Sequence, residues 1–300
     1  MHKSRTQQRR GCHTLALIGA LLLHGCTFNL NLNRPASDST PVVREDHSRN
    51  DGVAGTSTAV PSSPQASGRV TVRYQPGKTA DTRREEQLMK QDRLLEDFAE
   101  VINETFALPQ DLTVLGTDCD ESNAFYDSSN RTITVCYELA TTERALLVEA
   151  GYEDDDEIAT LLNQSTVGTL YHELGHALID VLALPFTGRE EDVADQLSAY
   201  VLTQDQATSH YLLTIANLYE QLAVQVTEVE ELTFADTHSL DAQRAVNFHC
   251  YAYGSDPRAY AYLVSEQRLD QSRAEGCEAE FEQMRGGWDA LLAPHFKEAS

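Results

Sequence analysis

The chain has 300 residues, and 41% of them are hydrophobic, so it can bury a sizeable core and form one globular domain with appendages. Its formal net charge of -24 at pH 7 argues against a nucleic-acid partner, because proteins that bind nucleic acid carry clustered basic side chains. The same charge disfavours docking of the folded part onto anionic lipid, although acidity by itself names no function.

The N-terminus has the pattern of an export signal. Basic residues precede an apolar run at 15–23, which has the length of a signal-peptide core and is too short to span a bilayer. We therefore predict a signal peptide over 1–25. The Leu-His-Gly-Cys sequence at 23–26 resembles a bacterial lipobox, in which Cys26 becomes the lipidated first residue of the mature protein.

This pattern predicts a lipoprotein of the bacterial cell envelope, periplasmic or associated with the outer membrane, that touches the membrane through its lipid anchor only. Because His24 is unusual in a lipobox, secretion without an anchor is the alternative. The stretch 27–68 is rich in Ser, Thr, Asn, Asp and Pro and has too little apolar surface to order itself. We predict that 26–68 is a lipidated cysteine with a disordered tether and that 69–300 is the folded domain.

The folded domain is predicted to contain a small sheet followed by many helices. A short strand is predicted near 69–74, and two or three more are predicted at 112–115, 123–127 and 131–137. A turn at 128–130 joins the last two strands. Between the first two strands, Thr82 and Glu85 resemble a capping box, and apolar residues from Leu88 to Phe106 recur at helical spacing. This order of elements predicts an α+β fold with a small, antiparallel-rich sheet and a predominantly helical remainder.

Four cysteines remain besides Cys12 and Cys26, and an even number in an exported chain indicates two disulfides. These four are Cys119, Cys136, Cys250 and Cys277. Pairing of the first with the second and of the third with the fourth is the local choice, although three connectivities are possible. The absence of CxxC spacing argues against a zinc site made of the four thiolates.

The sequence His-Glu-Leu-Gly-His at 172–176 is an HExxH motif. A helix would place His172 and His176 on one face as two metal ligands, with Glu173 beside them as a general base. Apolar residues at helical spacing surround the motif, and Pro185 follows it. The alternative interpretation is that these are two ordinary histidines on a half-buried helix.

A third ligand is needed to leave one position open on a tetrahedral zinc ion. Metzincins require Gly at 179 and His at 182, but Ile179 and Leu182 stand there. Glu191 and Asp195 are instead four residues apart on a second predicted helix. This ExxxD pattern is the gluzincin arrangement, in which Glu191 binds zinc and Asp195 orients a ligand histidine from behind. An acidic run at a helix start also stabilises the helix dipole, which accounts for the neighbouring carboxylates Glu190 and Asp192.

These stretches resemble the uncharacterised bacterial family labelled "putative metallopeptidase". The resemblance extends over roughly 85–290 and lies in six segments: 123–127, 136–139, 172–180, 187–197, 238–244 and 253–257. It implies a zincin-like domain. Asn123, Ala124 and Phe125 are similar to the edge strand of thermolysin and of the CAAX-processing membrane proteases, which pairs with an extended substrate. An ordinary amphipathic strand is the alternative.

His238 and Arg244 are similar to the Thr-His-Pro…Arg segment of those membrane proteases, although Ser239 replaces the proline. The resemblance implies that His238 donates a hydrogen bond to the oxyanion and that Arg244 supports the site. A surface histidine and a surface arginine are the alternative.

We therefore predict a zinc metallopeptidase that acts on a peptide or protein substrate. One Zn²⁺ per chain would be bound by His172, His176 and Glu191, and Glu173 would serve as the base. A non-catalytic metal-binding or scaffold lipoprotein that retains the fold is one alternative, although a structural site needs no base at Glu173. Hydrolysis of another carbonyl compound is a further alternative.

Overall fold

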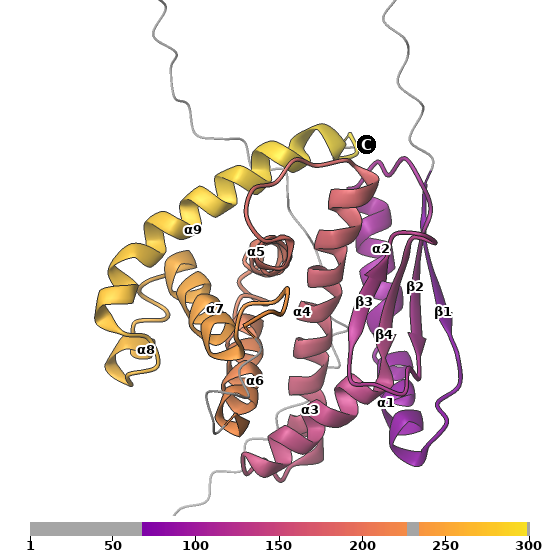
Figure 1. Cartoon of the computed structure of the whole chain (residues 1–300), viewed down its shortest axis with the longest axis horizontal. Helices are drawn as coiled ribbons and strands as arrows, with labels where there is room; N and C mark the ends of the chain where they lie inside the picture. Colours follow the sequence, from indigo (N-terminus) through magenta and orange to yellow (C-terminus); the bar gives the residue numbers. More distant parts are fainter. Residues whose placement is uncertain (1–67, 227–233, 299–300) are drawn as a thin grey trace, which may run out of the picture.

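The computed structural model of the chain describes residues 68–226 and 234–298. The predicted signal peptide, the lipidation of Cys26 and the tether up to residue 67 lie outside the described residues. Figure 1 shows a small sheet along one side of the molecule, with helices filling the rest.

Four strands form the sheet: β1 (Val70–Tyr74), β2 (Leu112–Thr117), β3 (Ala124–Asp127) and β4 (Thr132–Cys136). They lie in the order β1-β2-β4-β3. The pairs β1–β2 and β2–β4 are parallel, and the pair β3–β4 is antiparallel. The predicted α+β class is confirmed, but the sheet is mixed and not antiparallel-rich. The helices between β1 and β2 return the chain to the end of the sheet where β1 began, so β2 runs parallel to β1. In the same way β3 returns the chain to the end where β2 began, so β4 runs parallel to β2.

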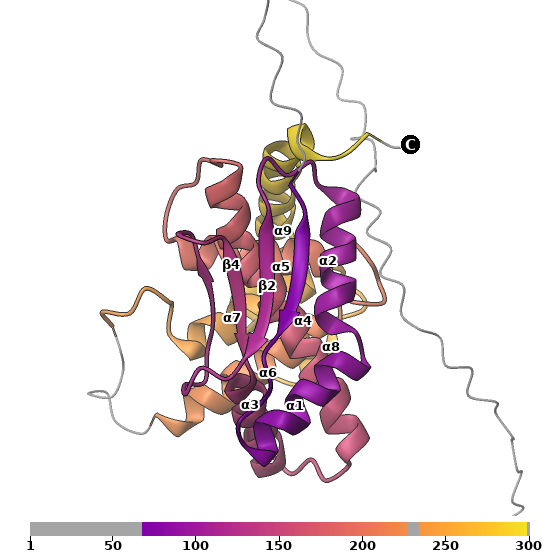
Figure 2. The ribbon, with the colours of Figure 1, turned by 90° about the vertical axis from the view of Figure 1, so that its right-hand side faces the viewer.

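One face of the sheet is buried. Along β2 buried residues alternate with partly exposed ones, so Leu112, Val114 and Gly116 face inward. This face packs against α2 (Leu94–Thr105) and α4 (Asp155–Val181). In Figure 2 the strands face the viewer and α4 lies behind them.

The first helical segment consists of two helices. α1 (Ala80–Gln91) is separated from α2 at Arg93, whose backbone is left-handed with φ 54°. Thr79 caps α1, because its hydroxyl accepts from the backbone N–H of Thr82 while the Thr82 hydroxyl accepts from the backbone N–H of Thr79. The predicted capping box of Thr82 and Glu85 is therefore wrong. The capping box begins three residues earlier, and Glu85 has other partners.

Glu85 is a buried carboxylate that joins α1 to α3 (Tyr137–Glu149). Arg144 donates two hydrogen bonds to it, from Nε at 2.8 Å and from Nη2 at 3.0 Å. Arg84 donates a third from its Nε at 2.8 Å. Two guanidinium groups thus balance the charge of this carboxylate and direct Arg144 towards α1.

The central helix is α4, which runs between the sheet and the other helices (Figure 1). Its start is capped by Asp154, whose carboxylate accepts from the backbone N–H groups of Asp156 and Glu157. Most of its residues from Ile158 onward are buried. Its buried residues are mainly apolar, and the buried polar ones include His172 and Glu173 of the HExxH motif.

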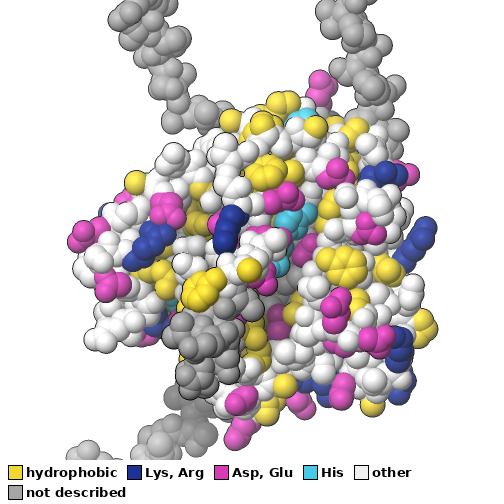
Figure 3. Space-filling model, in the orientation of Figure 1, with side chains coloured by type: hydrophobic (Ala, Val, Ile, Leu, Met, Phe, Trp, Pro, Cys, Tyr) yellow, Lys and Arg dark blue, Asp and Glu magenta, His cyan; other side chains and the backbone are white. Residues whose placement is uncertain are grey.

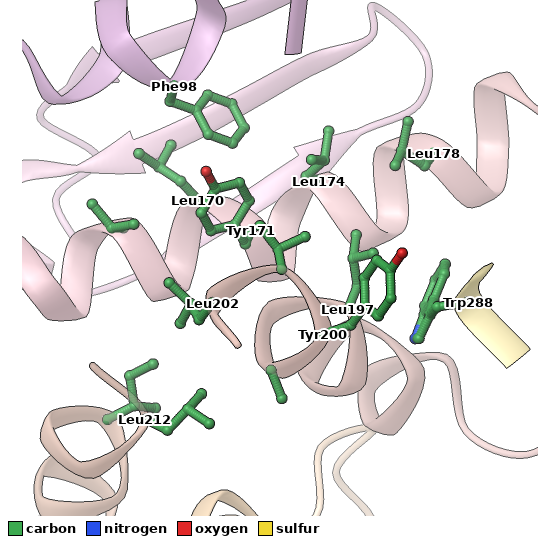
Figure 4. Packing of buried hydrophobic residues seen from close by; sticks show 14 of the residues in the cluster. Phe98, Leu170, Tyr171, Leu174, Leu178, Leu197, Tyr200, Leu202, Leu212 and Trp288 are labelled. Atoms are coloured by element: carbon green, nitrogen blue, oxygen red, sulfur yellow. The ribbon is translucent and has the colours of Figure 1, made fainter. Parts of the chain in front are cut away.

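The core lies on both sides of α4. Phe98 of α2 packs on Tyr171 of α4 with ring centroids 5.5 Å apart. On the opposite side, Tyr200 of α5 (Glu190–Leu202) lies 6.4 Å from the ring of Trp288. Figure 4 shows these side chains around the helix. The helix that carries the HExxH motif is therefore held from two directions.

The C-terminal half is helical, as predicted. The helices after α5 are α6 (Tyr211–Gln225), α7 (Asp241–Ser255), α8 (Tyr262–Ser265) and α9 (Gln271–Leu292). Both predicted disulfides are confirmed: Cys119–Cys136 joins the loop before β3 to the end of β4, and Cys250–Cys277 joins α7 to α9. Across the described ranges, none of the helices combines the length and the apolar character needed to span a bilayer.

His249 of α7 should make stability depend on pH. This side chain is fully buried, and burial together with the nearby Arg268 lowers its pKa from 6.5 to about 4. Below pH 6.5 the unfolded chain therefore binds more protons than the folded chain. We expect this residue to lower the free energy of unfolding by roughly 3 kcal/mol as the pH falls from about 6.5 to about 4.

Urea unfolding at several pH values would measure this loss, and the variant His249→Leu should lack it. If wild type and variant lost equal free energy of unfolding over this pH range, the interpretation of His249 would be wrong.

Candidate metal centre

The two histidines of the HExxH motif lie on one face of α4. His172 and His176 are one turn apart, and their Nε2 atoms are separated by 3.3 Å. Glu191 lies in the first turn of α5, with its Oε2 at 3.2 Å from Nε2 of His172 and 3.3 Å from Nε2 of His176. Three potential ligand atoms from two helices thus form a nearly equilateral triangle.

This triangle has the dimensions of a tetrahedral metal site. With metal–ligand bonds of about 2.0 Å, ligand atoms around a tetrahedral ion lie about 3.3 Å apart. The edges of the triangle, at 3.2, 3.3 and 3.3 Å, match that spacing. The residues therefore fit a divalent ion and leave a fourth position for another ligand.

Close packing of α4 against α5 makes the triangle possible. A Cβ at Gly175 would lie 2.8 Å from Cα of Ala194 and 3.1 Å from its Cβ. Ala194 is itself fully buried. Small residues at this crossing therefore bring the first turn of α5, with Glu191, within reach of the histidines.

Asp195 and Arg244 lie behind His172. The Nδ1 of His172 is 2.8 Å from Oδ1 of Asp195, which suits an Nδ1–H donor and leaves the lone pair of Nε2 available to a metal ion. Arg244 of α7 donates to both oxygens of Asp195, from Nε at 2.9 Å and from Nη2 at 2.7 Å. Its guanidinium also lies over the ring of Tyr219, 4.2 Å from the centroid. Asp195 is thereby held in one orientation.

Sequence reasoning missed the carboxylate partner of His176. The Nδ1 of His176 is 2.8 Å from Oε1 of Glu190, a residue that had been explained by the helix dipole alone. Asp192 also has a specific contact, because its Oδ1 accepts from the hydroxyl of Ser239 at 2.7 Å. A rule could have found Glu190: each ligand histidine needs a partner for its second ring nitrogen.

His238 lies beside the triangle, in the segment before α7. Its Nε2 is 2.9 Å from Oε2 of Glu191, and its ring stacks near that of His172 with centroids 6.1 Å apart. One ligand atom from each of these three residues lies within 4.8 Å of the other two. The Nδ1 of His238 is 3.2 Å from Oδ1 of Asp236, and its side chain is 42% exposed. His238 is therefore close enough to meet a molecule bound at the centre.

The charges of the centre shift its pKa values. Burial alone would lower the pKa of His172, but the carboxylates of Asp195 and Glu191 raise it to about 9. Burial alone would raise the pKa of Asp195, but Arg244 and His172 hold it at about 2. Burial raises the pKa of Glu173, whose side chain is almost fully enclosed. Uptake of a divalent ion should therefore release protons from the imidazoles.

A cavity of about 280 Å³ opens beside the triangle. Glu173 and His238 line it, as do Asn123 and Ala124 at the start of β3. Phe125 is not part of the lining, and its side chain is 38% exposed. Since β3 lies at the end of the strand order, its outer edge is unpaired within the described part of the chain. Figure 3 shows histidine side chains in a hollow on this face, with acidic and hydrophobic side chains around it.

The contact at Gly175 can be tested by substitution. In Gly175→Ala the new Cβ would push α5 away, so we expect metal affinity to fall at least about 10-fold and the free energy of unfolding to fall by roughly 1–3 kcal/mol. Calorimetric metal titration and thermal unfolding measure both. The matched control is Gly276→Ala in α9, where an added Cβ meets no atom within 4 Å and should slightly stabilise the helix. Equal behaviour of the two variants would contradict the packing argument.

The family comparison agrees with this geometry. The model of a family described as "putative metallopeptidase" matches residues 74–292, which include α4, α5 and the segment with His238. The search found no match among the curated proteins and none among the solved structures. The chain belongs to the family described as "putative metallopeptidase".

Proposed function

We propose that the chain is a zinc-dependent metallopeptidase in which His172, His176 and Glu191 hold one zinc ion. The observation that carries the proposal is the triangle of ligand atoms with edges of 3.2–3.3 Å. Glu173 lines the cavity beside this triangle, where a general base is needed. Family membership supports a peptidase.

Zinc is the ion that suits this set of ligands best. Two imidazoles and one carboxylate with a fourth position open are typical of catalytic zinc sites, whereas magnesium and calcium prefer oxygen ligands. When bound, zinc would acidify a water molecule and polarise the carbonyl group of the substrate.

Glu173 would move the proton in this reaction. Its carboxylate takes a proton from the attacking water and later delivers it to the nitrogen of the leaving amine, so that the peptide bond is replaced by a carboxylic acid and an amine. The raised pKa of Glu173 favours this role, because a more basic carboxylate takes up the proton more readily.

The remaining polar residues would stabilise the oxyanion and orient the ligand histidines. The Nε2–H of His238 donates to the oxyanion that develops on the carbonyl oxygen, and Asp236 fixes its ring from the Nδ1 side. Asp195 and Glu190 hold the two ligand histidines in the tautomer that binds metal. Arg244 keeps Asp195 in place.

The substrate would bind as an extended chain along β3. Asn123 and Ala124 line the cavity, and the outer edge of β3 offers backbone donors and acceptors to a peptide. Phe125 would lie outside the cavity, where its exposed ring can pack on a substrate residue further along the chain.

The mechanism predicts different outcomes for two variants. Glu173→Gln should retain one zinc ion per chain and lose hydrolysis by about 1,000-fold or more, because the base is removed. Glu191→Ala should lose both zinc and hydrolysis. Zinc content by mass spectrometry and digestion of a proteome-derived peptide library measure these two properties.

A matched control is Glu149→Gln, which alters an exposed carboxylate of α3 and should change neither property. Hydrolysis at the wild-type rate by Glu173→Gln would exclude Glu173 as the base. Zinc binding without any hydrolysis by wild type would favour a non-catalytic metal-binding module.

We also propose that the protein is a lipoprotein of the cell envelope. Two disulfides are consistent with an oxidising compartment outside the cytoplasm. If Cys26 carries the lipid, Cys26→Ser should move the full-length chain from the membrane fraction to the soluble fraction. Cys12→Ser, within the predicted signal peptide, is the control and should leave the chain in the membrane fraction. A membrane-bound Cys26→Ser protein would rule out this anchor.

A further inference from the structure

The cavity extends beyond the metal centre into a pocket between α3, α4 and α6. Its walls there carry five apolar side chains: Leu139 and Leu146 of α3, and Ile215, Leu218 and Leu222 of α6. The α4 wall carries the small residues Ser165, Gly168 and Thr169, and the side chain of Ile215 packs directly over Gly168. At about 280 Å³ in total, the space suits one long side chain rather than a large ligand.

A carboxylate that the proposed mechanism does not use lies in this pocket. Glu143 of α3 lines the cavity and accepts a hydrogen bond from the Ser165 hydroxyl at 2.7 Å. Among the described residues it forms no ion pair within 4.0 Å, whereas the adjacent Arg144 points to Glu85. Burial raises the pKa of Glu143 to about 7, as expected of a carboxyl group that lacks a positive partner.

The rest of the lining does not supply that partner. Among the described residues that line the cavity, Arg244 is the one Lys or Arg, and both oxygens of Asp195 already bind its guanidinium. Two further carboxylates, Glu173 and Asp241, also line the cavity. The pocket is thus apolar along much of its wall, holds four carboxylates against one guanidinium, and is continuous with the centre where the scissile bond would lie.

We propose that this pocket receives the side chain of the substrate residue next to the scissile bond and that Glu143 selects lysine or arginine there. The inference rests on the proposed function, since it assumes that a peptide is bound at the metal centre. The aliphatic stem of a basic residue would contact the leucine walls, and its charged end would pair with the Glu143 carboxylate. A norleucine side chain matches the stem but leaves the carboxylate without a partner.

Binding of metal-anchored peptides tests this selectivity without requiring hydrolysis. The probes are short peptide hydroxamates whose side chain nearest the hydroxamate is lysine, norleucine or glutamate, and the readout is calorimetric affinity for the zinc-loaded protein. We expect the lysine probe to bind wild type about 10- to 100-fold more tightly than the norleucine probe, and the glutamate probe to bind weakest.

Two variants assign the preference to one residue. Glu143→Gln keeps the size of the side chain and should bind the lysine and norleucine probes about equally, with an unchanged affinity for norleucine. Glu149→Gln on the same helix removes the same charge from the surface and should keep the wild-type preference. Zinc content and thermal unfolding of both variants would verify that the fold is intact.

The binding results distinguish failure of the Glu143 selectivity from failure of the proposed metallopeptidase function. Equal affinity of wild type for lysine and norleucine, or a lysine preference that survives in Glu143→Gln, would overturn the selectivity while leaving the metal centre intact. Failure of wild type to bind any of the three hydroxamates would overturn both proposals.

Discussion

The candidate metal centre depends on one close contact between two helices. Because Gly175 has no side chain, α5 can approach α4 until Ala194 touches its backbone, and the first turn of α5 then lies over the histidines. Glu191 and Asp195, one turn apart on α5, consequently meet opposite nitrogens of the same imidazole, that of His172. The geometry is set by the packing of two backbones inside a core, which holds side chains more firmly than a loop does.

Negative charge is concentrated around this contact. Three carboxylates, Glu190, Glu191 and Asp195, touch the two motif histidines, and Glu173 lies beside them in the same cavity. Without a divalent ion, protons on the imidazoles offset part of that charge. A bound ion would replace those protons, so the same carboxylates that raise the pKa of His172 also increase the attraction for metal.

Local periodicity was sufficient to predict the α+β class and the helix that carries the HExxH motif. His172 and His176 share a helix face because of their spacing, and the two disulfides are the local choice among the three connectivities that the sequence allowed. What local patterns cannot contain are contacts between elements. The contact of Gly175 with Ala194 is seen only where α5 crosses α4. The contact of Glu190 with His176 likewise requires both helices in place. The direction of each strand depends on which end of the sheet the preceding connection reaches. The break between α1 and α2 falls at Arg93, where no glycine indicates a left-handed residue.

The Cys119–Cys136 disulfide has a consequence for the edge strand β3. Its sulfurs close a loop with a sequence separation of 17 that contains all of β3, including the cavity-lining Ala124. Within the described ranges the strand is paired on one side only, so neighbouring strands hold it less firmly than they hold β2. A covalent loop restricts the conformations that the strand can adopt when it is unpaired. The edge strand would therefore lose less conformational entropy when an extended peptide binds to it. This smaller entropy cost is the thermodynamic advantage of a preorganised edge.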